Sequence, residues 1–183
     1  MIVSMIAALA ENRVIGSASG GIPWSLPRDR DHFRAYTEGK WLLLGRKTYE
    51  EMDGWFTDQT PLILTRDPAY IPGHPAHRPV ISPAAAIDLA RRHGATELVV
   101  CGGTGVYAAA IGLANKLVIT RVGKQVDVAD PVFFPDFETS GEWKTDYAET
   151  WSCDAENPLP MRLKIYRRVA CGTSSPGNNH SPI

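Results

Sequence analysis

The amino-acid sequence predicts an α/β protein with a mixed, mostly parallel sheet flanked by helices. Two short apolar runs, residues 2–9 and 41–44, are continuous rather than alternating, which is typical of strands covered on both faces. Helix-start signals containing serine, proline or glycine separate such runs along the chain. Two further runs, residues 143–151 and 161–169, have no helix between them and predict an antiparallel strand pair that closes the sheet.

Length and composition indicate one domain. The chain has 183 residues, of which 44% are hydrophobic and 21% charged, as in ordinary globular proteins. We expect a single domain over residues 1–169. Residues 170–183 contain no core-forming residue until the last, so this tail is expected to be disordered. A net charge of −1 gives no reason to expect nucleic acid or a membrane as the main partner.

The cysteines and the N-terminal run predict a cytoplasmic protein. Cys101, Cys153 and Cys171 are odd in number and far apart, so we expect free thiols in a reducing compartment. The apolar run over residues 1–10 has no basic region before it and no small-residue cleavage site after it. It is also too short to span a bilayer.

After the first strand, the sequence predicts a mobile loop followed by a helix. Three glycines fall within residues 16–21, and such loops beside a fixed scaffold often act as lids. A helix is predicted over residues 27–37, with Ser25 as its cap and Gly39 after its end. Asp29 then lies in the first turn, near the positive end of the helix dipole. Such an acid is either a capping residue or a functional group, and the helix alone does not decide between them.

Two later turns have the residue types of phosphate sites. The strand 41–44 runs into Gly45-Arg46-Lys47-Thr48 and a short helix through Met52, where N–H groups and cations converge. A solvated Arg-Lys pair is the alternative. The strand 97–101 runs into Gly102-Gly103-Thr104-Gly105-Val106-Tyr107 and another helix. This order suits a dinucleotide pyrophosphate, but the full Rossmann fingerprint is absent and a tight turn is the alternative.

The remaining segments complete the α/β pattern. They are predicted strands at 62–65, 80–81 and 116–120, a helix from Ser82-Pro83 to His93, and a strand end or bend within 128–137. His74 and His77 lie in the proline-rich loop between the strands 62–65 and 80–81. No third ligand is near them in the sequence and no helix aligns them, so we expect no metal site.

Together, these segments resemble dihydrofolate reductase over residues 1 to about 169. The resemblance rests on five motifs in the family's order, namely Ile6 to Gly16, Ile22-Pro23-Trp24-Ser25-Leu26-Pro27 with Asp29, Gly45 to Glu50, Leu64-Thr65-Arg66, and Gly102-Gly103 with Val106-Tyr107. It implies an eight-stranded sheet with four helices and a cis bond between Gly102 and Gly103. It further implies a monomeric antifolate target that transfers hydride from NADPH to C6 of 7,8-dihydrofolate, giving tetrahydrofolate for one-carbon metabolism.

The resemblance also implies roles for individual residues. Asp29 and Trp24 are the expected catalytic residues, with Asp29 bonded to the pterin ring and assisting protonation of N5. The expected substrate-binding residues are Ile6, Ala8, Asp29, Arg30, Phe33, Arg34, Met52 and Thr120. The expected NADPH-binding residues are Ala8, Ile15, Gly16, Gly45, Arg46, Lys47, Thr48, Leu64, Thr65, Arg66, Cys101, Gly102, Gly103, Thr104, Gly105, Val106 and Tyr107. The side-chain chemistry agrees, because two arginines suit a 2′-phosphate and a single buried acid suits protonation of a pterin.

The sequence departs from the family pattern at three places. Thr104 and Gly105 stand where the family has glycine and often arginine, which removes one possible phosphate contact. Arg30 replaces an apolar residue just after the acid, and Gln59 replaces the arginine that clamps the substrate's glutamate tail. Since a neutral amide cannot replace a bidentate guanidinium, we hypothesise that Arg30, aided by Arg34, recognises the tail. The alternative is that Arg30 simply points to solvent.

Three functions are compatible with these features. The first is dihydrofolate reductase. The second is a related NADPH-dependent reductase that acts on another pterin or on a ribosylated pyrimidine of riboflavin synthesis. The third is a non-catalytic protein that binds NADPH or folate. The acid at Asp29 favours a pterin, because a carboxylate matches the amino-pyrimidine edge of that ring.

Overall fold

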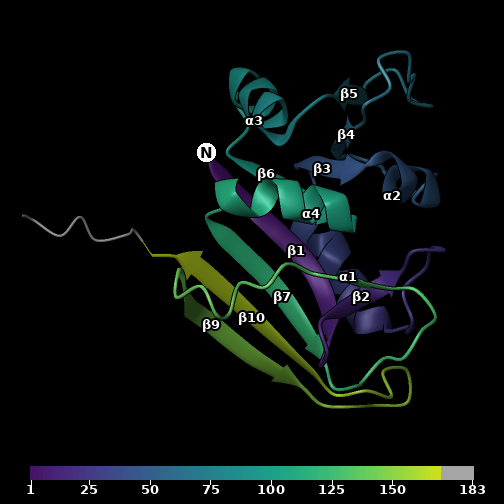
Figure 1. The fold of residues 1–183 in the computed structure, drawn as a ribbon, viewed down its shortest axis with the longest axis vertical. Helices are drawn as coiled ribbons and strands as arrows, with labels where there is room; N and C mark the ends of the chain where they lie inside the picture. Colours follow the sequence, from purple (N-terminus) through teal and green to yellow (C-terminus); the bar gives the residue numbers. More distant parts are fainter. Residues whose placement is uncertain (170–183) are drawn as a thin grey trace, which may run out of the picture.

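The computed structural model describes residues 1–169 (Figure 1). The tail at 170–183, for which the sequence predicts disorder, lies outside the described residues. In the described part of the chain, no helix combines the length and the apolar character that a membrane crossing requires.

Within residues 1–169, eight strands form one sheet in the order β5-β4-β3-β6-β1-β7-β10-β9. Their bounds are β1 Ile2–Ala10, β3 Trp41–Gly45, β4 Thr60–Leu64, β5 Arg78–Val80, β6 Glu97–Gly102, β7 Lys116–Val122, β9 Trp143–Trp151 and β10 Met161–Arg168. All neighbours from β5 to β7 are parallel, and β10 is antiparallel to both β7 and β9. The predicted mixed sheet with a closing antiparallel pair is therefore confirmed.

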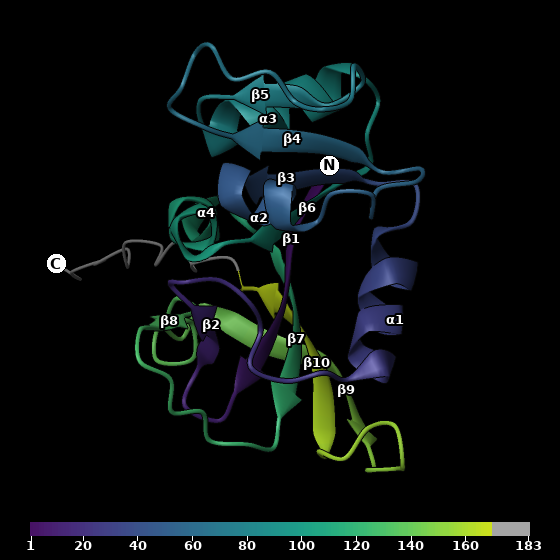
Figure 2. The ribbon, with the colours of Figure 1, turned by 90° about the vertical axis from the view of Figure 1, so that its right-hand side faces the viewer.

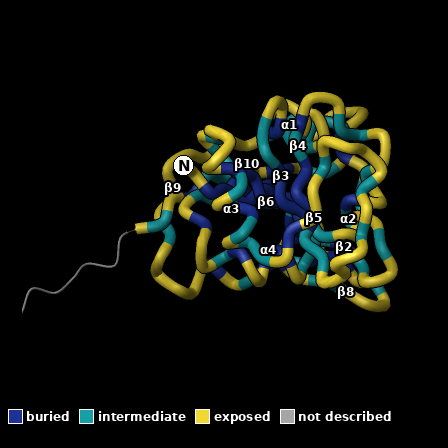
Figure 3. The backbone as a smooth tube through the Cα atoms, turned by 90° about the horizontal axis from the view of Figure 1, so that it is seen from above, coloured by how far each residue is buried: buried dark blue, intermediate teal, exposed yellow. Residues whose placement is uncertain are grey.

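Helices cover both faces of this sheet. The described chain has four α-helices and one 3-10 turn, which are α1 Pro27–Thr37, α2 Arg46–Glu51, α3 Pro83–Arg92, α4 Thr104–Ala110 and η1 Ile111–Leu113. Figure 2 shows α1 on one side of the sheet and α4 on the other. Side chains of α1 and α2 pack against one buried cluster, and those of α3 and α4 belong to a second. The buried residues accordingly lie in the middle of the molecule (Figure 3), which explains why the central strands are apolar on both faces.

A second, two-stranded sheet was missed by the sequence prediction. β2 Val14–Ser17 pairs antiparallel with β8 Pro131–Phe133. The sequence predicted a loop from Gly16 onward and only a strand end or bend within 128–137. Both strands are short and one contains glycine, so neither carries the periodicity that identifies a strand.

Two local predictions were also wrong. The fifth strand ends at Val80 rather than Ile81, which is 82% exposed. Ser25 does not cap α1, because the N-cap position is Leu26. The first free N–H of the helix, at Arg28, instead donates to Oδ1 of Asn157 over 2.9 Å. This cap comes from 129 residues away, which no local pattern reveals.

Candidate active site

The predicted substrate residues gather where the parallel strands end. Ala8 of β1 lies directly beside Thr120 of β7 in the sheet, and Ile6 of β1 is 4% exposed. Phe33 of α1 and Met52 after α2 pack against the same cluster as Ile6. This edge, outside the carboxyl ends of parallel strands, is where ligands bind in open α/β sheets.

Asp29 is a half-buried acid at this edge. It occupies the first turn of α1. Burial raises the pKa of the Asp29 carboxyl, and a side-chain hydrogen bond with Thr120 opposes that rise without cancelling it. Removal from water disfavours the charged form. The site therefore holds a carboxyl group with a raised affinity for a proton.

The Pro-Trp turn and the helix start fix the position of Asp29. Trp24 packs against two small apolar clusters, one with Val14 and one with Leu26. Arg28 donates from its guanidinium to the carbonyl of Ser152 and to Asp154. Together with the Asn157 cap, these contacts tie the start of α1 to the loop between β9 and β10. Side chains locked by such contacts hold a functional group in one geometry.

The predicted pyrophosphate turn lies between α2 and α4. The Gly102–Gly103 peptide is cis, as the resemblance implies, and Gly102 has a φ of +119°. A Cβ at Gly45 would lie 3.2 Å from Val106 of α4, and one at Gly103 would lie 3.2 Å from the Thr48 hydroxyl of α2. Glycine at both positions thus lets the starts of the two helices approach each other.

Three of the predicted cofactor residues have buried side chains. Cys101, Val106 and Tyr107 belong to the core clusters, and burial raises the pKa values of the Cys101 thiol and the Tyr107 hydroxyl. The Tyr107 hydroxyl donates to the carbonyl of Ile6 over 2.7 Å. These side chains therefore support the turn and join it to β1.

The predicted cations differ in their surroundings. Arg46 lies 3.8 Å from carboxylate oxygens of Glu50 and Asp67. Arg66 follows β4, is exposed, and has no ion pair among residues 1–169. Of the two arginines, Arg66 is thus the one whose charge is free for an anion.

The glycine-rich loop contacts the start of α2. The Lys47 ammonium donates to the carbonyl of Ala18 over 2.6 Å, and the Ala18 N–H donates to the carbonyl of Asp130 over 2.8 Å. A Cβ at Gly20 would lie 2.8 Å from a Glu51 carboxylate oxygen. The sequence predicted a loop with little packing of its own, whereas contacts from two distant segments hold it. Neither contact leaves a local sequence signal.

The residues at the predicted tail position are also arranged differently from the family pattern. Gln59 is buried, and its side-chain oxygen accepts from the N–H groups of Thr57 and Asp58. Arg34 lies over the ring of Trp55, 4.5 Å from its centroid. Arg30 is exposed. The role of Trp55 had no signal in the sequence.

The two loop histidines have a structural role. Nδ1 of His77 is hydrogen-bonded to the Tyr49 hydroxyl over 2.8 Å, and its ring packs edge-on against Tyr49 and Phe56. In the part of the chain that the structure describes, no three His, Cys, Asp or Glu residues are placed to hold a metal ion.

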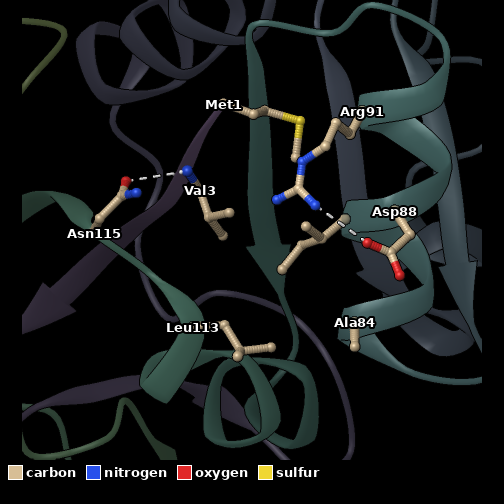
Figure 4. A pocket seen from close by; sticks show the side chains of 8 residues that line it. Met1, Val3, Ala84, Asp88, Arg91, Leu113 and Asn115 are labelled. Atoms are coloured by element: carbon tan, nitrogen blue, oxygen red, sulfur yellow. Dashed lines mark hydrogen bonds and ion pairs between the residues drawn. The ribbon is translucent and has the colours of Figure 1, made fainter.

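A cavity of about 310 Å³ lies at the opposite edge of the sheet, near Met1, Val3 and Leu113 (Figure 4). Two contacts join polar groups of its lining. Asn115 accepts from the N–H of Val3, and Asp88 pairs with Arg91. These pairs stabilise the start of β1 and the surface of α3, and none of the predicted site residues lines this cavity.

A family model decides the identity of this fold and site. The model for dihydrofolate reductase matches residues 2–168. The chain belongs to the dihydrofolate reductase family. Its activity is the NADPH-dependent reduction of dihydrofolate.

Individual relatives agree with the dihydrofolate reductase assignment. The chain is 32% identical to dihydrofolate reductase type 3 of Salmonella typhimurium over 86% of this chain and 92% of that protein. It is 30% identical to the dihydrofolate reductase of Haemophilus influenzae over 92% and 99%. A solved structure of dihydrofolate reductase from Enterococcus faecalis, complexed with NADP(H) and RAB-propyl, matches with a TM-score of 0.80 and 26% identity, covering 91% and 96%.

Proposed function

We propose that Asp29 is the acid that assists protonation of N5 while hydride arrives at C6 of 7,8-dihydrofolate. The observation that carries this proposal is the burial of the Asp29 carboxyl at the strand ends, which raises its pKa. A carboxyl group with raised proton affinity binds a proton more readily than an exposed aspartate does, and passes it to the ring nitrogen directly or through water. Trp24, from the fixed Pro-Trp turn, covers this side of the site.

The substrate pocket is built from the walls around Asp29. Ile6, Ala8, Phe33, Met52 and Thr120 supply the apolar surface and the hydroxyl that contact the pterin and the ring beyond it. Apolar walls exclude water and strengthen the bonds between the carboxyl and the amino-pyrimidine edge.

The NADPH site extends from the pterin pocket to Arg66. The residues fit the cofactor because glycines at Gly45, Gly102 and Gly103 leave space for backbone N–H groups to approach a phosphate. Bound NADPH supplies the hydride. Arg46, Lys47, Thr48 and Arg66 hold its phosphates, and the remaining predicted residues, Ala8, Ile15, Gly16, Leu64, Thr65, Thr104 and Gly105, line the rest of the groove.

A substrate comparison tests this assignment. The decrease in NADPH absorbance is measured with 7,8-dihydrofolate and, separately, with a ribosylated pyrimidine of riboflavin synthesis. We expect turnover with dihydrofolate only, because Asp29 matches the pterin edge. Turnover of the pyrimidine at an equal kcat/KM would contradict the assignment of Asp29 to a pterin.

The loop at residues 16–21 is proposed to gate the nicotinamide site. Lys47, which donates a hydrogen bond to this loop, lies at the start of α2 beside Arg46. The loop and the proposed NADPH phosphate site therefore both contact the start of α2. We expect amide hydrogen exchange of this loop to slow when NADPH binds. Lys47→Met should speed exchange in the free protein several-fold, since one charge-assisted bond is lost. Full protection of the loop in the free parent protein would rule out gating.

We also propose a monomer in the cytoplasm. Every residue assigned to the site comes from one chain, so catalysis needs no partner copy. The thiols of Cys101 and Cys153 are free, which suits a reducing compartment.

A further inference from the structure

A groove of about 460 Å³ lies between α1 and the loop that precedes β4. Charged side chains of Asp31, Arg34, Glu38 and Asp58 line it. Phe33, which belongs to the proposed pterin pocket, packs against Trp55, and Trp55 packs against Arg34. The Trp55 ring thus links Phe33 of the proposed pterin pocket to Arg34 in the lining of the groove.

Arg34 is the one cation in the lining of this groove among the described residues. Its guanidinium lies over the Trp55 ring and has no carboxylate within 4 Å in residues 1–169. Stacking on an aromatic ring pre-orients a guanidinium and leaves its edge free for a carboxylate. Arg34 is thus placed to bind one carboxylate of the substrate tail, whereas Arg30 is absent from the lining.

Gln59 provides neither a positive charge nor an available side-chain oxygen for binding the substrate tail. Its oxygen is occupied by the N–H groups of Thr57 and Asp58 at 3.0 and 3.3 Å. These bonds shape the loop that forms one wall of the groove. Gln59 therefore has a structural role here and does not bind the tail through that oxygen.

Three carboxylates, Asp31, Glu38 and Asp58, line the same groove as Arg34. Asp58 is held in place because its Oδ2 accepts from the N–H of Gly39 over 2.9 Å. Asp31 on α1 and Glu38 at its C-cap are exposed. The groove beyond Arg34 thus has a negative field, which repels an anion in proportion to its charge.

We propose that this groove selects folates with a single glutamate and discriminates against oligo-γ-glutamyl tails. The inference rests on the proposed placement of the pterin at Asp29. The first carboxylate of the tail pairs with Arg34. Each added glutamate brings one more negative charge toward Asp31, Glu38 and Asp58, and the described lining of the groove has no further cation to receive it.

Steady-state kinetics with dihydrofolate carrying one, three or five glutamates tests this proposal. Because the acids are exposed and screened, we expect the KM to rise about 3-fold per added glutamate at low salt, and less at 0.5 M salt. An equal or lower KM for the longer tails would overturn the proposal. A complete lack of turnover with dihydrofolate of any tail length would instead overturn the placement of the substrate.

Variants assign the effect to the groove. The combined variant Asp31→Asn, Glu38→Gln, Asp58→Asn should bring the KM for the triglutamate close to that for the monoglutamate. The single variant Glu38→Gln, whose side chain has no hydrogen bond to lose within the described residues, should remove part of the difference. Asp88→Asn replaces a matched exposed acid on α3. This variant should show the same dependence of KM on tail length as the parent protein. A tail dependence that persists in the combined variant would show that these acids do not cause it.

Arg34→Leu tests whether Arg34 binds the first carboxylate of the substrate tail. It should raise the KM for the monoglutamate about 10-fold, the loss of one charge-assisted contact. An unchanged KM would mean that Arg34 does not receive the first carboxylate.

Discussion

Asp29→Asn is expected to slow hydride transfer at pH 7 by about 10²-fold or more, the usual size of a general-acid contribution. Asparagine keeps the shape of the side chain but has no carboxyl proton to supply for N5. The rate is measured in a single turnover from the loss of NADPH absorbance, so that product release does not hide the chemical step.

Acid pH and stability provide the controls for Asp29→Asn. Activity should partly return at low pH, where the substrate is protonated by solvent. Burial raises the pKa of Asp29, so its stabilising contribution is full below the unfolded pKa and is lost as pH rises through the folded one. The ionised carboxylate therefore destabilises the parent at neutral pH, and the variant should unfold at no lower temperature than the parent. A variant that is as active as the parent at pH 7 would remove Asp29 from the mechanism.

Arg66→Ala is expected to raise the KM for NADPH by about 10- to 100-fold, because a charge-assisted contact with a phosphate contributes about 1.5–3 kcal/mol. The KM for NADH should hardly change, since NADH lacks the 2′-phosphate. Initial rates with both cofactors measure this ratio.

Arg46→Ala is the matched comparison. Arg46 already lies beside the carboxylates of Glu50 and Asp67, which partly compensate its positive charge. Its replacement should therefore raise the KM for NADPH less than Arg66→Ala does. Equal losses with NADPH and NADH in either variant would mean that the arginine supports the fold instead of the 2′-phosphate.

The order of elements could be predicted because it depends on local patterns. Residues 42–44 and 98–101 are buried on both faces of a parallel sheet and are therefore continuously apolar. Gly39 and Gly94 follow helices at positive φ, the conformation that ends a helix most easily with glycine. The acid after the Pro-Trp turn also lies where the sequence indicated.

The features that could not be predicted depend on contacts between distant segments. Asn157 caps α1, and Asp130 and Lys47 hold the loop at Ala18. The inward turn of Gln59 and the stacking of Arg34 on Trp55 depend on the path of the loop before β4. Side-chain direction in such loops follows from tertiary packing and not from residue type.

The central claim is that burial at the strand ends gives Asp29 the proton affinity of a catalytic acid. A titration of the Asp29 carboxyl carbon by NMR, assigned by its loss in Asp29→Asn, tests this claim most directly. We expect a pKa above the ordinary value of about 3.9 for an exposed aspartate, since desolvation outweighs the hydrogen bond with Thr120. A pKa at or below that ordinary value would contradict the account.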